Sequence, residues 1–361
     1  MNLALRLAQR AQGRTSPNPL VGAVLVKDGR IVGQGYHRRA GLPHAEVEAL
    51  RHAGRRSRGS TLYVTLEPCN HVGRTPPCCD AILAAGVRRV VAATRDPNPR
   101  THGRGLARLR RAGLRVQAGV LAREAQQINE PFFTSMRTRR PFVIAKAGQS
   151  LDGKIATSRG ASRWITSAAS RRQSHRLRAQ VDAILVGITT VLRDDPRLTA
   201  RGTNTRAGRP VKVIVDSRLR LPASARCLSA HSPAPTLIAT TTHSAARRVQ
   251  LTRRGVEVLV FRPYRGRVPL RPLCRELVRR GLHSVLIEGG GEVLASAFAE
   301  RIVDRIAWFV APMLIGGRTA PGSVGGEGIA RLASAVRLRD LSVRRVGPDL
   351  CIEASVVYPK H

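Results

Sequence analysis

The feature that most constrains this chain is a histidine and two cysteines, His44, Cys69 and Cys78, that can bind one metal ion together. Zinc with three protein ligands keeps its fourth position open for water, whereas four protein ligands form a closed structural site. Glu46 follows the histidine by two residues, so it can move protons without binding the metal. The fold must therefore bring these positions together around one ion.

The order of these residues is typical of zinc-dependent base deaminases. Their pattern is H-x-E followed by P-C-x-x-C, and the chain has His44-Ala45-Glu46 and later Pro68-Cys69. The second half is longer here, because eight residues separate Cys69 from Cys78. Bound zinc lowers the pKa of its water towards neutrality, so we expect hydrolytic chemistry with Glu46 as the proton shuttle. A structural zinc site, or none, is the alternative.

Strands and helices alternate in the first part of the chain, which predicts a layered α/β domain. Apolar periodicity predicts a first helix within residues 1–15, although this acid-free, arginine-containing stretch also resembles a transit peptide. The expected strands are 21–26, 31–36, 61–66, 87–93 and 114–119. After the first helix, the expected helices are 44–53, 78–85 and 105–112. His44, Glu46 and Cys78 then lie at the starts of helices, whose N-termini favour thiolates. Cys79 points about 100° away from Cys78 on a helix, so we interpret it as a packing residue.

A second α/β pattern follows, as a length of 361 residues leads us to expect. Residues 134–140 have no apolar periodicity, so we place the junction there, with domains over 1–138 and 139–361. The expected strands are 142–145, 183–186, 211–215, 236–239, 256–261 and 284–287. Gly289-Gly290-Gly291 follows the last of these and precedes a helix at 293–299, where backbone N–H groups can approach a phosphate. A plain tight turn is the alternative, and without G-x-G-x-x-G a Rossmann domain is not supported.

The net charge of +39 does not by itself indicate nucleic acid binding. Only five of the 62 basic residues are lysine, and the arginines are spread along the whole chain. Aromatic residues are 3% of the chain, too few for an obvious base-stacking surface. We therefore expect no specific nucleic acid partner. No apolar run is long enough for a membrane helix, and six cysteines without a disulfide framework indicate the reducing cytoplasm.

Several segments resemble the bifunctional deaminase/reductase family of riboflavin biosynthesis. They are Thr-Leu-Glu-Pro-Cys-Asn-His-Val-Gly-Arg-Thr-Pro-Pro-Cys at 65–78, Pro-Asn-Pro-Leu-Val-Gly at 17–22 and Asp-Pro-Asn-Pro at 96–99. The resemblance implies that the substrate is 2,5-diamino-6-(5-phosphoribosylamino)pyrimidin-4-one, which loses its 2-amino group. It also implies that Asn18 and His71 contact the base. Alternatively, Asn18 only caps the turn at Pro19.

The resemblance continues through residues 150–154, 162–166 and 194–199 into the family's reductase domain. That domain is similar in fold to dihydrofolate reductase and uses NADPH to reduce the ribosyl group of 5-amino-6-(5-phosphoribosylamino)uracil to ribityl. The implied NADPH contacts are Gly148, Trp164, Thr190, Asp194, Ser217, Gly290, Gly291, Glu292, Val293, Leu294, Ala295 and Ser296. The implied substrate contacts are Lys154, Ser162, Arg178, Leu198, Arg201 and Glu288.

Two points of this assignment stay open. Arginine forks suit a ribose phosphate, but Arg178 and Arg201 could instead be solvated surface residues in a chain so rich in arginine. Met313 stands where related sequences often carry lysine, which leaves the role of that position undefined.

We therefore predict an α/β enzyme with a cytidine-deaminase-like three-layer domain followed by a dihydrofolate-reductase-like domain. It uses Zn²⁺ and NADPH, acts on a phosphorylated pyrimidine, and by resemblance forms a cytoplasmic homo-oligomer with no membrane partner. One alternative is a nucleobase or tRNA-base deaminase fused to an unrelated domain, which the missing C-x-x-C spacing disfavours. The other is a basic nucleic-acid-binding protein with an inactive zinc fold, which the intact His44, Glu46, Cys69 and Cys78 disfavour.

Overall fold

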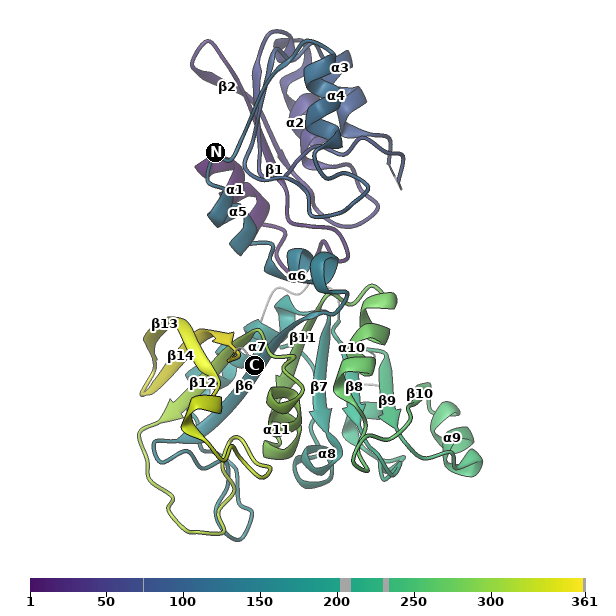
Figure 1. The fold of residues 1–361 in the computed structure, drawn as a ribbon, viewed down its shortest axis with the longest axis vertical. Helices are drawn as coiled ribbons and strands as arrows, with labels where there is room; N and C mark the ends of the chain where they lie inside the picture. The colour runs from purple at the N-terminus through teal and green to yellow at the C-terminus, as the bar shows by residue number, and fades with distance from the viewer. Residues whose placement is uncertain (74, 202–208, 230–233, 360–361) are drawn as a thin grey trace. The chain divides into compact units, whose positions relative to one another are not determined.

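The chain folds into two units, Met1–Arg139 and Arg140–His361, in the computed structural model shown in Figure 1. The structure describes residues 1–73, 75–201, 209–229 and 234–359. Arg74, in the segment between Cys69 and Cys78, lies outside the described residues. Among the described residues, no helix combines the length and the apolar character needed to cross a bilayer.

The first unit is built on a mixed sheet that has, within the described residues, five strands in the order β2-β1-β3-β4-β5. The strands are β1 (Gly22–Lys27), β2 (Arg30–Tyr36), β3 (Thr61–Val64), β4 (Arg89–Ala92) and β5 (Arg115–Ala118). The helices are α1 (Asn2–Gln9), α2 (Ala45–Ala53), α3 (Cys78–Ala84), α4 (Arg104–Arg111), α5 (Ala122–Gln127) and α6 (Glu130–Thr138). A 3-10 turn covers Gly54–Ser57. β1 is antiparallel to β2 and β3, whereas β3, β4 and β5 run parallel.

Alternation along β1 shows why this unit has three layers. Leu25 packs in a cluster with Ala49 of α2, whereas Val24 packs with Leu7 of α1. Successive side chains of a strand point to opposite faces of the sheet, so α1 and α2 cover opposite faces. The three-layer α/β prediction is confirmed.

The second unit is built on a sheet with nine strands among the described residues, in the order β10-β9-β8-β7-β11-β6-β12-β14-β13. The strands are β6 (Phe142–Ser150), β7 (Ala183–Gly187), β8 (Val211–Val215), β9 (Thr236–Thr240), β10 (Val256–Val260), β11 (Ser284–Glu288), β12 (Arg305–Ala311), β13 (Arg337–Val346) and β14 (Asp349–Val357). The helices are α7 (Ala168–Gln180), α8 (Ile188–Asp194), α9 (Ala245–Thr252), α10 (Leu270–Arg279) and α11 (Gly291–Ala299). Short 3-10 turns cover Arg226–Leu228 and Leu332–Ser334.

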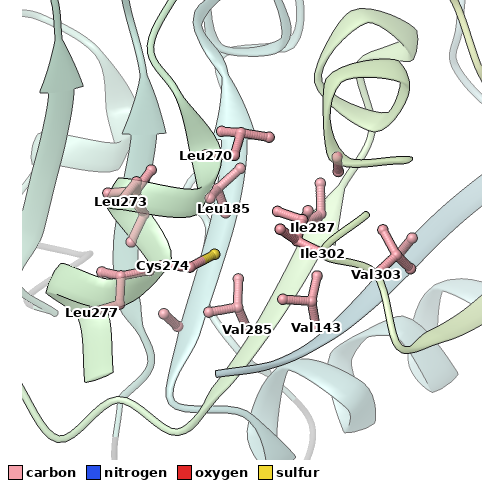
Figure 2. Packing of buried hydrophobic residues seen from close by; sticks show 14 of the residues in the cluster. Val143, Leu185, Leu270, Leu273, Cys274, Leu277, Val285, Ile287, Ile302 and Val303 are labelled. Atoms are coloured by element: carbon pink, nitrogen blue, oxygen red, sulfur yellow. The ribbon is translucent and has the colours of Figure 1, made fainter. Parts of the chain in front are cut away.

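The strands from β10 to β12 run parallel, and only β14 and β13 are antiparallel to their neighbours. One face of this sheet packs against α10. Figure 2 shows Leu185 of β7 beside Leu273, and Ile287 of β11 belongs to the same cluster. On the other face Ile184 belongs to a separate cluster. Because helices cover both faces, the parallel strands are apolar runs.

Helices α5 and α6 were not predicted. Most of the stretch that we expected to be an irregular junction belongs to helix α6. This helix has Pro131 in its first turn and buries Phe133. Its nine residues are too few for a clear period. Strands β12, β13 and β14 were missed as well. β13 is exposed along almost its whole length, so its sequence has no apolar run to reveal it.

The first testable prediction concerns the contact between α2 and β2. A Cβ atom on Gly35 would lie 2.5 Å from the Ala49 nitrogen and 2.7 Å from the Ala45 oxygen, so only glycine allows this approach. We expect Gly35→Ala to lower the free energy of unfolding by about 1–3 kcal/mol because overpacking displaces the helix. Zinc content should also fall, because α2 carries Glu46 and follows His44.

Chemical denaturation and metal analysis of the purified variant measure both effects. Gln34→Ala is the matched control, because Gln34 lies on the same strand and is exposed. A Gly35→Ala protein as stable as the wild type would contradict the tight contact.

Candidate active sites

Three side chains from separate segments form a metal-binding cluster in the first unit. His44 is the N-cap of α2, Cys78 is the first residue of α3, and Cys69 lies in the segment after β3. The His44 Nδ1 atom is 3.2 Å from the Cys78 Sγ atom and 3.6 Å from the Cys69 Sγ atom. The ligand atoms of all three lie within 4.8 Å of one another. This donor set fits zinc with one open position.

The surroundings of Cys69 favour its thiolate. The Cys78 thiol donates a hydrogen bond to Cys69 and lowers the pKa of Cys69 to about 4. The Cys78 backbone N–H also donates to the Cys69 sulfur over 3.3 Å. Zinc binds cysteine as thiolate. The neighbours of Cys69 therefore favour the form of the sulfur that the metal requires.

Glu46 lies in the first turn of α2 and is 3% exposed. Burial raises the pKa of this carboxyl to about 7. A group that exchanges protons efficiently at neutral pH has a pKa near the working pH. Glu46 therefore has the character of a general acid–base next to the metal-binding cluster.

The structure links Asn18 to this cluster through His37, which sequence reasoning missed. The Asn18 Nδ2 atom is 3.0 Å from the His37 Nε2 atom, and the His37 Nδ1 atom is 3.1 Å from the Pro43 oxygen. The His37 ring meets the His44 ring edge-on at 5.3 Å. The Asn18 side chain therefore bonds to His37 and does not serve only as a cap of the turn at Pro19. A single histidine after a strand gave no sequence signal.

The second predicted base contact, His71, lies in the longer segment between the two cysteines. Its Nδ1 atom is 3.5 Å from the Thr101 Oγ1 atom. The loop that carries Thr101 is held by Glu67, which accepts backbone N–H bonds from Gly103 at 2.9 Å and Leu106 at 3.2 Å. Glu67 is buried, and its structural role was not predicted.

Cys79 is also fully buried, as expected of a packing residue.

In the second unit, Arg178 and Glu288 form a buried two-pronged ion pair. The Arg178 Nε and Nη2 atoms lie 2.7 and 2.5 Å from the two Glu288 oxygens. Burial alone would raise the pKa of Glu288, but the Arg178 charge and its hydrogen bonds outweigh burial and lower it to about 2. Arg178 is thus not a solvated surface residue. Arg201, by contrast, is exposed and bonds locally to Thr199.

Lys146 lies next to this ion pair and was not among the predicted site residues. It is the register partner of Glu288 across β6 and β11. Burial lowers the pKa of Lys146, and the Glu288 carboxylate opposes that shift. The sequence did contain a signal for Lys146 as a site residue: it is a lysine inside an apolar strand, in a chain with only five lysines.

The predicted phosphate turn lies at the N-terminus of α11. Gly289 and Gly290 adopt left-handed conformations, with φ of 70° and 81°. A Cβ atom on Gly290 would lie 3.1 Å from the Thr190 Oγ1 atom, so two predicted NADPH contacts lie together. On the neighbouring strand end, a Cβ atom on Gly187 would lie 2.7 Å from the Val293 side chain. The space beside Gly289 is open, whereas a Cβ atom on Gly291 would lie 2.9 Å from the Gly322 oxygen. A glycine turn at a helix N-terminus fits a phosphate group.

The structure also shows the neighbours of several other predicted contacts of the second unit. Ser162 donates a hydrogen bond to the Asp194 carboxylate over 3.2 Å, and Trp164 is 67% exposed with the Arg171 guanidinium 4.3 Å from its ring. Gly148 lies beside Thr166. Lys154 bonds to the Ala320 carbonyl over 3.3 Å and so holds the loop around residue 320.

Two predicted contacts have buried side chains. The side chains of Leu198 and Leu294 are 2% and 1% exposed and belong to the two hydrophobic clusters of this unit. The Leu294 N–H also donates to the Gly290 carbonyl. These two side chains therefore pack in the core, and the ligand contacts of the two residues stay predictions.

Comparison with known proteins covers both units. Residues 1–94 match the cytidine and deoxycytidylate deaminase zinc-binding region, and residues 141–352 match the RibD C-terminal domain. The chain is 45% identical to the riboflavin biosynthesis protein RibD of Aquifex aeolicus, over 98% of this chain and 96% of that protein. It is 43% identical to RibD of Escherichia coli, over 98% and 97%.

Solved structures agree with these matches. Acinetobacter baumannii RibD, form 1, is similar with a TM-score of 0.90 at 36% identity, over 99% of this chain and 97% of that one. A Thermotoga maritima protein is similar with a TM-score of 0.86 at 35% identity, over the same shares of the two chains. That protein is described as a diaminohydroxyphosphoribosylaminopyrimidine deaminase/5-amino-6-(5-phosphoribosylamino)uracil reductase. The dihydrofolate-reductase-like prediction for the second unit agrees with the family match.

The second testable prediction concerns the pH dependence of the Arg178–Glu288 pair. Glu288 has a pKa of about 2 in the folded protein against a usual 4.5, so its contribution to stability is complete above pH 4.5 and is lost as pH falls towards 2. We expect the stability difference between wild type and Glu288→Gln to shrink by about 1.4 kcal/mol for each pH unit below 4.5.

Denaturant unfolding of both proteins at pH 7, 5, 4 and 3 measures this difference. Glu327→Gln is the control, because Glu327 is exposed. A wild-type advantage over Glu288→Gln that stays constant down to pH 3 would contradict the assignment.

Proposed function

Because the chain belongs to the RibD family of riboflavin-biosynthesis proteins, we propose that its two domains divide two consecutive reactions. Residues 1–138 form the zinc-dependent deaminase, and residues 139–361 form the NADPH-dependent reductase. The observation that carries the first assignment is the cluster of His44, Cys69 and Cys78 beside a buried Glu46. The product of deamination is the substrate of reduction.

The deaminase domain removes the 2-amino group of 2,5-diamino-6-(5-phosphoribosylamino)pyrimidin-4-one. A zinc ion held by His44, Cys69 and Cys78 would supply an acidified water at the open position. Glu46 takes a proton from the attacking water while a C–O bond forms at C2 of the pyrimidine. Glu46 then gives a proton to the amino nitrogen, the C–N bond breaks, and ammonia leaves. The raised pKa of Glu46 supports this double role.

Residues around the cluster orient the base. The hydrogen bond to His37 uses one donor of the Asn18 amide, which leaves the Asn18 oxygen as an acceptor for an amino group of the base. His71 lies in the segment between Cys69 and Cys78, which is longer than in other base deaminases. We assign these two residues to base recognition.

The reductase domain converts the ribosyl group of 5-amino-6-(5-phosphoribosylamino)uracil to ribityl. NADPH held at the glycine turn of α11 would supply the hydride for C1′ of the sugar. The ring C–O bond breaks, and its oxygen gains a proton. Lys146 is the candidate proton donor, since burial lowers the pKa of its ammonium group and it is the register partner of Glu288. Arg178 and Glu288 hold each other in position next to it.

NADPH is assigned to the residues around the glycine turn. They are Gly148, Trp164, Thr190, Asp194, Ser217 and the stretch Gly290–Ser296, in which Leu294 supports the turn from the core. Ser162, Lys154, Arg201 and the backbone at Leu198 are assigned to the sugar phosphate side. The glycine turn at the N-terminus of α11 and the closeness of Gly290 to Thr190 support the phosphate position.

We also propose a homo-oligomer in the cytoplasm. β13 ends the strand order, so within the described residues one of its edges has no partner strand. Leu341 and Val343 on this strand are 61% and 54% exposed. A long exposed edge strand with apolar residues favours pairing with another chain, and a second copy of this chain is the occupant. Six free cysteines support a reducing compartment.

The third testable prediction separates the two sites. We expect Glu46→Gln to lower the deamination rate on the order of 100- to 10,000-fold, because the amide cannot transfer protons. Zinc content and reduction of supplied deaminated substrate should stay at the wild-type level. Ammonia release and NADPH oxidation are followed in parallel. If reduction were lost together with deamination in a folded, zinc-containing variant, the assignment of separate sites would be wrong.

The fourth testable prediction concerns assembly. We expect Val343→Glu to convert the oligomer to monomers, because a carboxylate cannot be buried without a partner. Light scattering on the eluting protein measures the mass. Ser342→Glu introduces the same charge one residue earlier, on the other face of β13, and should leave the oligomer intact. A Val343→Glu oligomer of unchanged mass would exclude this strand as the interface.

A further inference from the structure

His175 is a half-buried histidine of the second unit that neither proposed reaction uses. It lies on α7 three residues before Arg178, so the two side chains share one face of the helix. The Arg178 Nη1 atom donates to the Thr199 carbonyl over 2.9 Å, and the His175 Nδ1 atom is 3.1 Å from that oxygen. The Arg201 backbone nitrogen is 3.2 Å from the same ring nitrogen. His175 therefore joins α7 to the segment that carries Arg201.

The contacts of the His175 ring define which of its nitrogens carries the proton. The Thr199 carbonyl already accepts a hydrogen bond from Arg178, whereas the Arg201 N–H is a donor that only an acceptor can pair. Burial lowers the pKa of His175, and the charges of Arg178 and Arg201 lower it further, whereas Glu288 and the Thr199 carbonyl oppose that shift. The ring is therefore neutral at neutral pH. Its Nδ1 atom accepts from Arg201, and its proton is on Nε2.

This bond fixes the backbone from which the Arg201 side chain extends. The Arg201 Nε atom donates to the Thr199 hydroxyl over 3.2 Å, and Arg178 holds the carbonyl of the same threonine. The backbone and the inner nitrogen of this guanidinium thus have defined partners, and the side chain is exposed. The two terminal nitrogens of a guanidinium bind a phosphate in a bidentate manner.

Positive charge is concentrated around Arg201. Desolvation lowers the pKa of its guanidinium, and the charges of Arg197, Arg178 and Arg226 lower it further because like charges repel one another. Glu288 offsets the charge of Arg178 through the two-pronged ion pair. A phosphate monoester carries up to two negative charges, so its binding beside Arg201 relieves this repulsion.

We propose that His175 is a positioning residue of the reductase, which holds Arg201 in the orientation that binds the 5′-phosphate of the sugar. This inference rests on the proposed reductase function. His175 acts through the Arg201 backbone and does not touch the substrate. The competing interpretation is a direct hydrogen bond from its Nε2–H to the phosphate, which the experiment below distinguishes.

Substitution of His175 and Arg201, singly and together, tests whether one acts through the other. Reduction of supplied 5-amino-6-(5-phosphoribosylamino)uracil by the full-length protein is measured at saturating NADPH. We expect His175→Leu to raise the KM for this substrate on the order of tenfold, about the contribution of one charged hydrogen bond. The kcat should stay within about twofold, because the phosphate is remote from the reacting carbon and its binding is uniform.

Arg201→Gln should raise the KM at least as much as His175→Leu. The double variant should have the KM of Arg201→Gln alone, because a positioning residue has no effect once the group that it positions is removed. Multiplied effects of the two substitutions on the KM would overturn the proposal.

Two conservative variants distinguish positioning from direct contact. Asparagine places an amide oxygen near the position of Nδ1, whereas glutamine places its amide near the position of Nε2. We expect His175→Asn to restore the KM towards the wild-type value and His175→Gln to leave it raised. The opposite result would overturn the proposal, because it would show that Nε2 contacts the phosphate. Both variants are polar, so this comparison also holds if His175→Leu fails to fold.

Gln180→Leu is the matched control, because it makes the same polar-to-apolar change at an exposed position of α7. It should have the wild-type KM, and the KM for NADPH should be unchanged in every variant. A KM for NADPH that rises together with the KM for the sugar phosphate would overturn the proposal, because it would show a general disturbance of the site.

The wild-type protein separates this inference from the function on which it rests. If the wild type reduces the supplied substrate and the variants fail the tests above, only the role of His175 is overturned. If the folded wild type does not oxidise NADPH with this substrate, the reductase function and the role of His175 are both overturned.

Discussion

Both sites depend on one constraint, that residues following parallel strands meet at the same edge of a sheet. In the first unit β3 leads to Cys69, which meets the N-termini of α2 and α3. In the second unit β11 leads to the glycine turn at Gly290, β7 to Thr190 and β8 to Ser217. Positions distant in the sequence are therefore neighbours because their strands are neighbours. Close helix packing, such as that of α2 on Gly35, then fixes each helix N-terminus at that edge.

Two buried glutamates show how neighbours decide what a carboxyl can do. Glu46 and Glu288 are 3% and 7% exposed, so burial disfavours the charge of both. Glu46 has no bidentate cation beside it among the described residues, and burial raises its pKa to about 7. Burial acts on Glu288 too, but Arg178 outweighs it and holds the pKa at about 2. One carboxyl is thus suited to exchange protons, whereas the other is a permanent charge.

Much of the fold could be predicted because its strands are strongly patterned. The parallel strands of the second unit are apolar runs, since helices cover both faces of the sheet. β13 lacks such a run because it is exposed, and α6 is too short to show a period. Leu198 and Leu294 were assigned to ligands by their place in family motifs. Their burial in the core depends on side-chain directions that the motifs do not encode.

The sequence by itself determined the chemistry of this protein: the identity and spacing of His44, Glu46, Cys69 and Cys78, and the glycines at 289–291. Ligand type and backbone freedom are properties of residues, so they can be read from their order. Only the tertiary structure decided which groups act together. The bond from Asn18 to His37, the register of Lys146 with Glu288 and the approach of Gly290 to Thr190 each join separate segments. Such pairs form because packing brings their elements into contact, and no local pattern records that contact.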